Sequence, residues 1–155
     1  MNPKEIEYAL EGCEFFELLE KNEISEIAGL CQVNRYKPCE YVFQQGDHGE
    51  HLYIIVQGYV SLERSMDLGK HKGNVVIDAL GKGRVLGCWS TLLDIPHTLM
   101  SSAICQKPTI ILAIKGSDLR RIMVGNTLLG FNLMERLCFL LRDRIQAAYG
   151  AMEKI

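Results

Sequence analysis

The sequence lacks the features that mark several classes of protein. Its 17 basic and 19 acidic residues give a net charge of −2, without the basic excess that a free-standing nucleic-acid-binding domain usually carries. No apolar run approaches the ~20 residues that cross a bilayer. The N-terminal segment MNPKEIEYALEG places charges where a signal peptide needs an apolar stretch. We therefore expect a cytoplasmic protein that contacts neither a membrane nor, through this chain, nucleic acid.

The cysteines also lack the spacing of a metal or disulfide framework. No CxxC or CxH pattern occurs, whereas iron–sulfur clusters use several cysteines close in sequence. Disulfides belong mainly to secreted chains, so we expect free thiols that act as small, mostly buried side chains. The six are Cys13, Cys31, Cys39, Cys88, Cys105 and Cys138.

Catalytic motifs are missing as well. No GxSxG sequence surrounds a serine. His48 and His51 would point to opposite faces of a strand, and Glu63 comes too late to complete a metal site of the cupin type. His71 lies in a glycine-rich turn among lysines, which is typical of a solvated hairpin tip. We expect no enzyme and no metal centre.

What the sequence contains is a change of hydrophobic period along a chain of 155 residues, a length that suits a single domain spanning residues 1–155. Residues 1–30 show helical spacing, with Asn22 as the expected N-cap of a second helix. Residues 32–114 show short β-branched and aromatic runs separated by glycine turns, which predict an antiparallel sandwich or roll. Helical spacing returns over residues 117–155, with caps expected at Ser117–Asp118 and at Asn126.

The last helix carries two apolar stripes. One has near-heptad spacing, and the other adds Leu129, Leu133 and Leu140. Both stripes could cover the sheet, but we favour a homodimer in which the first stripe packs on the identical helix of a partner. The first stripe consists of Met134, Leu137, Leu141, Ile145, Ala148 and Met152.

The stretch KPCEYVFQQGDHGEHLYIIVQGYVSLER, residues 37–64, closely resembles the front half of the cyclic-nucleotide-binding domain, found in catabolite-activator and fumarate-nitrate-type regulators. Gly46 and Gly58 match its two turns. The resemblance implies a mainly β fold with flanking helices. This fold is an antiparallel double-stranded β-helix, a jelly-roll or cupin-like roll, with N-terminal helices and a long C-terminal dimerisation helix. It implies a small-molecule effector and signal transduction related to transcription regulation. We expect no DNA-binding domain within these residues.

The resemblance also locates a ligand box in VLGCWSTLLDIPHTLMSSA, residues 85–103. In the family, backbone N–H groups of a short helix receive the cyclic phosphate, a glutamate holds the ribose, and an arginine pairs with the phosphate. Here a cysteine stands at the glutamate's place and a histidine at the arginine's. The implied ligand-binding residues are Gly87, Cys88, Trp89, Ser90, Thr91, His97 and Thr98.

Replacing both charged anchors weakens the case for a cyclic nucleotide. Hydrogen bonds to charged groups contribute roughly 1.5–3 kcal/mol each, and ~1.4 kcal/mol is about tenfold in affinity. We therefore expect tight binding of cAMP or cGMP to be lost or much weakened. The alternatives are a haem ligated by Cys88 and His97, a thiol-based sensor at Cys88, or a dimerisation module that binds no small ligand.

Overall fold

The computed structural model describes residues 1–87, 92–93, 95 and 97–154. Two helices come first, ten short strands follow, and two helices end the described chain. The helices are α1 (Pro3–Glu11), α2 (Lys21–Ala28), α4 (Gly116–Gly125) and α5 (Thr127–Met152). The strands are β1 (Gln32–Tyr36), β2 (Tyr41–Phe43), β3 (His48–Gly49), β4 (His51–Gln57), β5 (Val60–Asp67), β6 (Lys72–Leu80), β7 (Val85–Leu86), β8 (His97–Thr98), β9 (Ser102–Cys105) and β10 (Thr109–Lys115).

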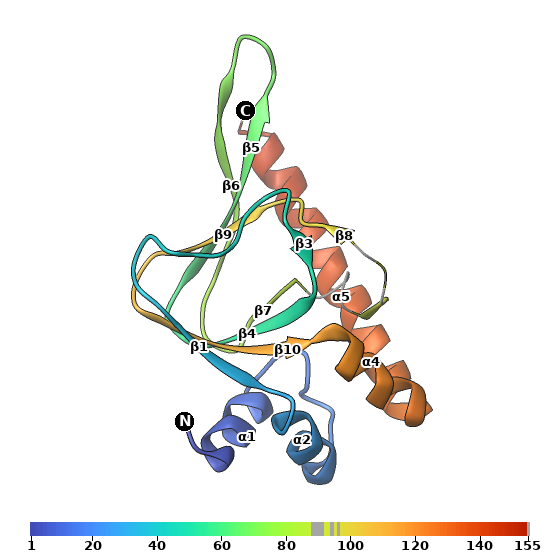
Figure 1. Cartoon of the computed structure of the whole chain (residues 1–155). Coiled ribbons are helices and arrows are strands. Elements are labelled where there is room, and N and C mark those ends of the chain that lie inside the picture. The colour runs from blue at the N-terminus through green and yellow to red at the C-terminus, as the bar shows by residue number, and fades with distance from the viewer. Residues whose placement is uncertain (88–91, 94, 96, 155) are drawn as a thin grey trace.

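The strands form a roll of two four-stranded antiparallel sheets. One sheet has the order β1-β10-β4-β7 and the other β2-β9-β5-β6, and β3 pairs with β8 in a separate short ladder. In Figure 1, α1 and α2 lie against the first sheet. The β5–β6 hairpin rises beside the C-terminal end of α5. The structure confirms the predicted fold class, a mainly β antiparallel roll with flanking helices.

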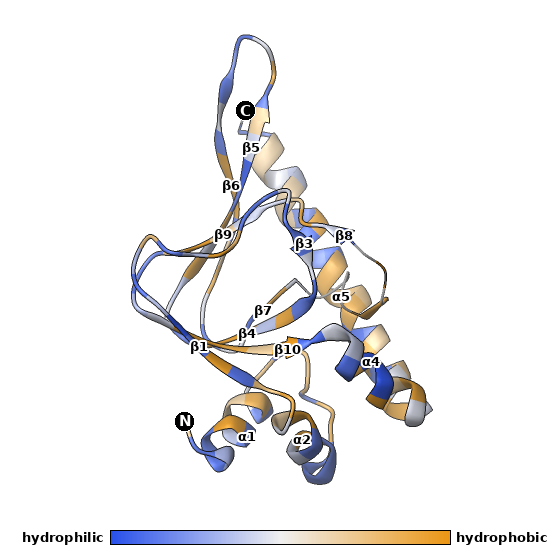
Figure 2. Cartoon of the chain, in the orientation of Figure 1, coloured by the Kyte–Doolittle hydropathy of each residue, from blue (hydrophilic) through white to orange (hydrophobic). Residues whose placement is uncertain are grey.

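The first sheet separates two hydrophobic cores. Along β4, Leu52 and Ile54 face the helices, whereas Tyr53 and Ile55 face the interior of the roll, so both faces of this strand are apolar. The helix-side core joins the first sheet to α1, α2, α4 and α5. Figure 2 shows α1 and α2 in both colours, with the hydrophilic side away from the roll.

The interior core is made by alternate residues of both sheets, and aromatic residues pack against its edge. Such alternation follows from the two-residue period of a strand. Its buried members are Phe43, Ile55, Val60, Leu62, Leu80, Leu86, Leu99, Ala103, Cys105 and Ile111.

The predicted turn glycines have the expected backbone. Gly46 and Gly58 have φ of +94° and +112°. At Gly58 an added Cβ would lie 2.3 Å from the Thr109 Oγ1 atom, so glycine is required there both for its φ and for space. The turns that open and close β4 are therefore fixed by the sequence.

Two of the three predicted helix caps are wrong. Helix α2 begins at Lys21 after the N-cap residue Glu20, so Asn22 lies inside the first turn. Helix α4 begins at Gly116 directly after β10, so Ser117 and Asp118 also lie inside the helix. Asn126 is confirmed as a cap, because its side chain accepts a hydrogen bond from the Leu129 N–H at 3.2 Å.

Helix α5 is attached to the roll differently in its two halves. The proximal half, residues 127–140, supplies Leu129, Gly130, Leu133, Leu137 and Leu140 to the buried set. The structure describes every residue of this helix, and in its distal half, residues 141–152, Ala151 alone is buried.

The predicted partner-facing stripe on α5 needs one correction. Leu137 is 5% exposed and belongs to the helix-side core, since at 3.6 residues per turn it shares a face with Leu133 and Leu140. Cys138, which is exposed, takes its place. The exposed or half-buried stripe then has a regular spacing of four and three residues and consists of Met134, Cys138, Leu141, Ile145, Ala148 and Met152.

Candidate functional site

The site predicted from the sequence begins where β7 ends, at Gly87. This residue has φ of +69°, and an added Cβ would lie 2.8 Å from the His51 carbonyl oxygen and 3.4 Å from the Tyr53 ring. Side chains rarely adopt this conformation, and here there is also no room for one. The backbone therefore enters the ligand box pressed against β4.

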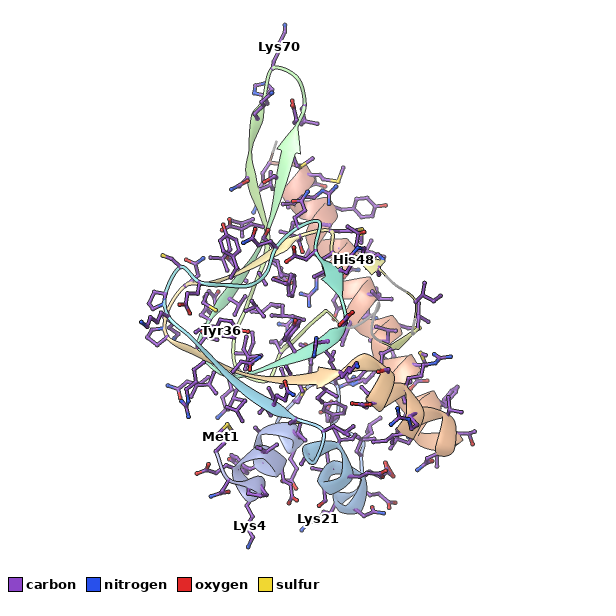
Figure 3. All side chains as sticks on the ribbon, viewed as in Figure 1. Met1, Lys4, Lys21, Tyr36, His48 and Lys70 are labelled. Atoms are coloured by element: carbon purple, nitrogen blue, oxygen red, sulfur yellow. The ribbon has the colours of Figure 1, made fainter. Side chains whose placement is uncertain are left out.

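Four of the predicted ligand-binding residues, Cys88, Trp89, Ser90 and Thr91, lie outside the described residues. The other side of the box is described from His97, which is half-buried in β8. Strand β8 pairs with β3, so that His97 is opposite Gly49 and Thr98 is opposite His48. Figure 3 labels His48 on β3. Gly87 and His97, ten positions apart, thus both lie against the segment 48–53.

That segment carries an aromatic row that the sequence analysis did not assign to the site. The Tyr53 ring lies 5.7 Å from the Phe43 ring and 5.9 Å from the His51 ring, measured between centroids. Burial raises the Tyr53 pKa, and the nearby Tyr36, Asp47 and Glu50 raise it further. The phenol therefore stays protonated and can donate a hydrogen bond. Alternation along β4 is the signal that could have placed Tyr53 inside the roll.

Two arginines outside the predicted box hold its main chain. Arg120 of α4 donates to the Leu92 carbonyl oxygen at 2.5 Å, and Arg64 of β5 donates to the Met100 carbonyl oxygen. Leu92 is fully buried, whereas Leu93 and Ile95 are exposed. These arginines hold the main chain of the box at Leu92 and Met100. The sequence gives no signal for either arginine, because any residue supplies a carbonyl acceptor.

The metal and thiol alternatives both involve Cys88, which lies outside the described residues. Within the described residues, no group of three or more His, Cys, Asp or Glu side chains could hold a metal ion. Five cysteines are free thiols, and burial raises the pKa of Cys13 and of Cys31 to about 12. Of the suggested haem pair, Cys88 lies outside the described residues. Nor is any helix among the described residues both long and apolar enough to cross a membrane.

Comparison with known proteins gives one family. The profile of the cyclic nucleotide-binding domain matches residues 33–126, more than half of the chain. No curated protein matches the chain. Among solved structures, the cyclic nucleotide-binding domain from Methylobacillus flagellatus KT has a TM-score of 0.79 and 21% identity, covering 99% of this chain and 84% of that one.

Two longer proteins contain a similar unit. The catabolite activator protein of Thermus thermophilus has a TM-score of 0.70 and 28% identity, covering 84% of this chain and 59% of that one. The regulatory subunit of a cAMP-independent protein kinase A from Trypanosoma brucei, a triple mutant with cAMP bound in its A site, has a TM-score of 0.74 and 19% identity. That similarity covers 98% of this chain and 51% of the subunit. The chain thus spans between half and three fifths of the length of these two proteins.

Proposed function

Because the chain belongs to the cyclic nucleotide-binding domain family, we propose that it is a non-catalytic sensor domain of the catabolite-activator type. It binds a small molecule in the box between β7 and β8 and passes the signal to α5. Coupling between two sites requires that the ligand bind one packing of the helix better than another. A relationship to transcriptional regulators agrees with the likeness to the Thermus activator.

The observation that carries the proposal is the constrained backbone at the described parts of the box, residues 85–87 and 97–100. Gly87 keeps a conformation and a close approach to β4 that only glycine permits. The far side is held by pairing of β8 with β3 and by the arginine contacts to Leu92 and Met100. A box built with such constraint favours a ligand site that still functions.

The proposed ligand is not a tightly bound cyclic nucleotide. By family resemblance His97 stands where an arginine pairs with the phosphate. The imidazole of His97 cannot form the two-pronged hydrogen bond that a guanidinium forms with a phosphate. The Trypanosoma subunit, described as cAMP-independent, was solved with cAMP after three substitutions that include threonine to arginine. This precedent supports the importance of an arginine for binding.

Thermal unfolding with cAMP or cGMP tests this proposal. A ligand at about 100 times its dissociation constant adds about 2.7 kcal/mol to the native state, and each kcal/mol raises the Tm of a domain this size by about 2–4 °C. We expect no shift for the unaltered protein at micromolar nucleotide and a shift of several degrees for the double variant Cys88→Glu, His97→Arg. His71→Arg, which makes the same histidine-to-arginine change at the exposed hairpin tip, is the control for the arginine substitution.

Each outcome has a distinct meaning. A clear shift of the unaltered protein at micromolar nucleotide contradicts the loss of tight binding. If neither protein responds at millimolar nucleotide, the box does not bind cyclic nucleotides even with both anchors restored. Addition of haem, followed by absorption spectroscopy, then separates a haem sensor using Cys88 and His97 from a module that only dimerises.

We also propose that the partner in signalling is a second copy of the chain, paired through α5. Cys138, Ile145 and Met152 are exposed and Met134, Leu141 and Ala148 are half-buried, and together these residues have the spacing at which two helices pack side by side. Ile145 and Met152 are 54% and 56% exposed in the single chain, which is unusual for apolar residues on one continuous helix face. A two-fold axis would bury this stripe against itself.

A further inference from the structure

One side chain fastens the distal half of α5 to two strands at once. Arg144 donates from Nη1 to the Asp78 Oδ2 atom of β6 at 2.7 Å and from Nη2 to the Val85 carbonyl oxygen of β7 at 3.1 Å. The Arg144 and Asp78 side chains are 23% and 27% exposed, so water screens the ion pair only in part. The second oxygen of Asp78 accepts from the Ala79 N–H, which fixes the carboxylate.

Val85 is held from its other side by the N-terminal loop. Its N–H donates to the Glu14 Oε1 atom at 3.2 Å, and Arg84 forms an ion pair with the same carboxylate. Arg136 of α5 donates to the Glu14 carbonyl oxygen at 2.9 Å. The peptide groups of Val85 therefore lie between two contacts that both lead to α5, and Val85 is two residues from Gly87.

We propose that Arg144 is a positioning residue that makes β7 and the distal half of α5 move as one unit. The inference rests on the proposed function, because β7 leads directly into the ligand box. In the distal half Ala151 is buried and Leu141 packs partly against the helix-side core, and Arg144 supplies the polar contacts that join this half to β6 and β7. A displacement of Val85 caused by a ligand would break or remake the contact to Arg144 and so free or hold residues 141–152.

Arginine is required for this role because its planar guanidinium presents several donors in a fixed geometry. A lysine has a single ammonium group and can pair with Asp78, but it does not bridge the carboxylate and the Val85 carbonyl in the same way. Arg144→Lys thus separates the contact to β6 from the contact to β7. Arg144→Gln removes the charge and weakens both.

Hydrogen–deuterium exchange of the unliganded protein, read by mass spectrometry, tests the inference. In Arg144→Gln we expect exchange at residues 85–87 and 141–152 to become about tenfold faster together, which corresponds to ~1.4 kcal/mol. Residues 129–140 should keep their protection. Arg142→Gln, on the exposed side of the same turn, is the control and should change neither segment.

Faster exchange in the helix alone, or in neither segment, would overturn the inference. If Arg144→Gln loosens the whole domain, Arg144→Lys decides: we expect faster exchange at residues 85–87 with residues 141–152 still protected. Equal loosening of every segment in the lysine variant would show a general structural role and reject the proposal. Since no ligand is present, the result does not depend on the nucleotide titration, so the two proposals fail separately.

Discussion

The two halves of α5 differ in composition and in their relation to the rest of the molecule, since residues 127–140 contain five leucines and residues 141–152 contain one. The proximal half is fixed by leucines in the helix-side core, whereas the distal half is held by Arg144 beside the β5–β6 hairpin. Apolar burial over many contacts gives one stable arrangement, and an ion pair with one main-chain contact can be exchanged for another at small cost. The comparison indicates that residues 127–140 of α5 are fixed to the roll, whereas residues 141–152 can be released from it.

The largest expected effect on stability comes from truncating one leucine in the proximal half of α5. Leu133 is 1% exposed, and Leu133→Ala should lower the free energy of unfolding by about 2–5 kcal/mol, the usual cost of a buried leucine with its cavity. Ile145→Ala, in the distal half, should change it by less than about 0.5 kcal/mol at concentrations where the chain is monomeric. Urea unfolding of both variants measures the difference. Equal losses would contradict the division of the helix.

Two glycines of α5 should change the stability of the domain in opposite directions when they are replaced by alanine. An added Cβ at Gly130 would lie 2.7 Å from the Met123 carbonyl oxygen of α4. At Gly150, no described atom beyond the neighbouring turns of the helix lies within 4 Å of such a Cβ. Gly130→Ala should therefore destabilise the domain by about 1–3 kcal/mol through overpacking. Gly150→Ala should stabilise it by up to ~1 kcal/mol, because alanine favours the helix. Thermal unfolding measures both, and a stabilising Gly130→Ala would show that α4 and α5 are not in close contact.

Thiol labelling tests whether the exposed stripe becomes buried against a second copy. Cys39 and Cys138 are exposed, whereas burial keeps Cys13 and Cys31 protonated with pKa values of about 12. With a thiol reagent at pH 8, read site by site by mass spectrometry, we expect Cys138 to react more slowly as protein concentration rises. Cys39, on the far side of the roll, is the internal control. A Cys138 rate independent of concentration, together with a monomer in light scattering, would reject pairing through α5.

Much of the architecture is predictable because it depends on periodicity. The change from helical to strand period at residue 32 and back after residue 115 gave the order of the elements, since alternation along a strand and capping by Asn126 act locally. Gly87 was identified by resemblance, and its left-handed backbone against β4 gives the physical reason for a glycine.

The remainder depends on contacts that have no sequence pattern. Leu137 and Cys138 are adjacent and both apolar, so spacing alone does not decide which one faces the roll. Cys39 has φ of +71° after Pro38, a backbone normally given to glycine, which composition does not indicate. Arg64, Arg120 and Arg144 bind main-chain carbonyl groups, and a carbonyl is present at every residue. Only the folded chain shows which carbonyl each arginine reaches.

The bond between Arg136 and Glu14 also bears on how the domain folds. It joins residues that are 122 positions apart in the sequence. Strand β1, which is the first strand, likewise pairs with β10, which is the last. Domains dominated by such distant pairings fold slowly, in milliseconds to seconds, because long loops must close before their contacts stabilise them. During synthesis, α1 and α2 would expose their apolar faces until β10 and α5 have left the ribosome. The helix proposed to carry the signal, α5, is thus also the last element needed to cover the apolar faces of α1 and α2.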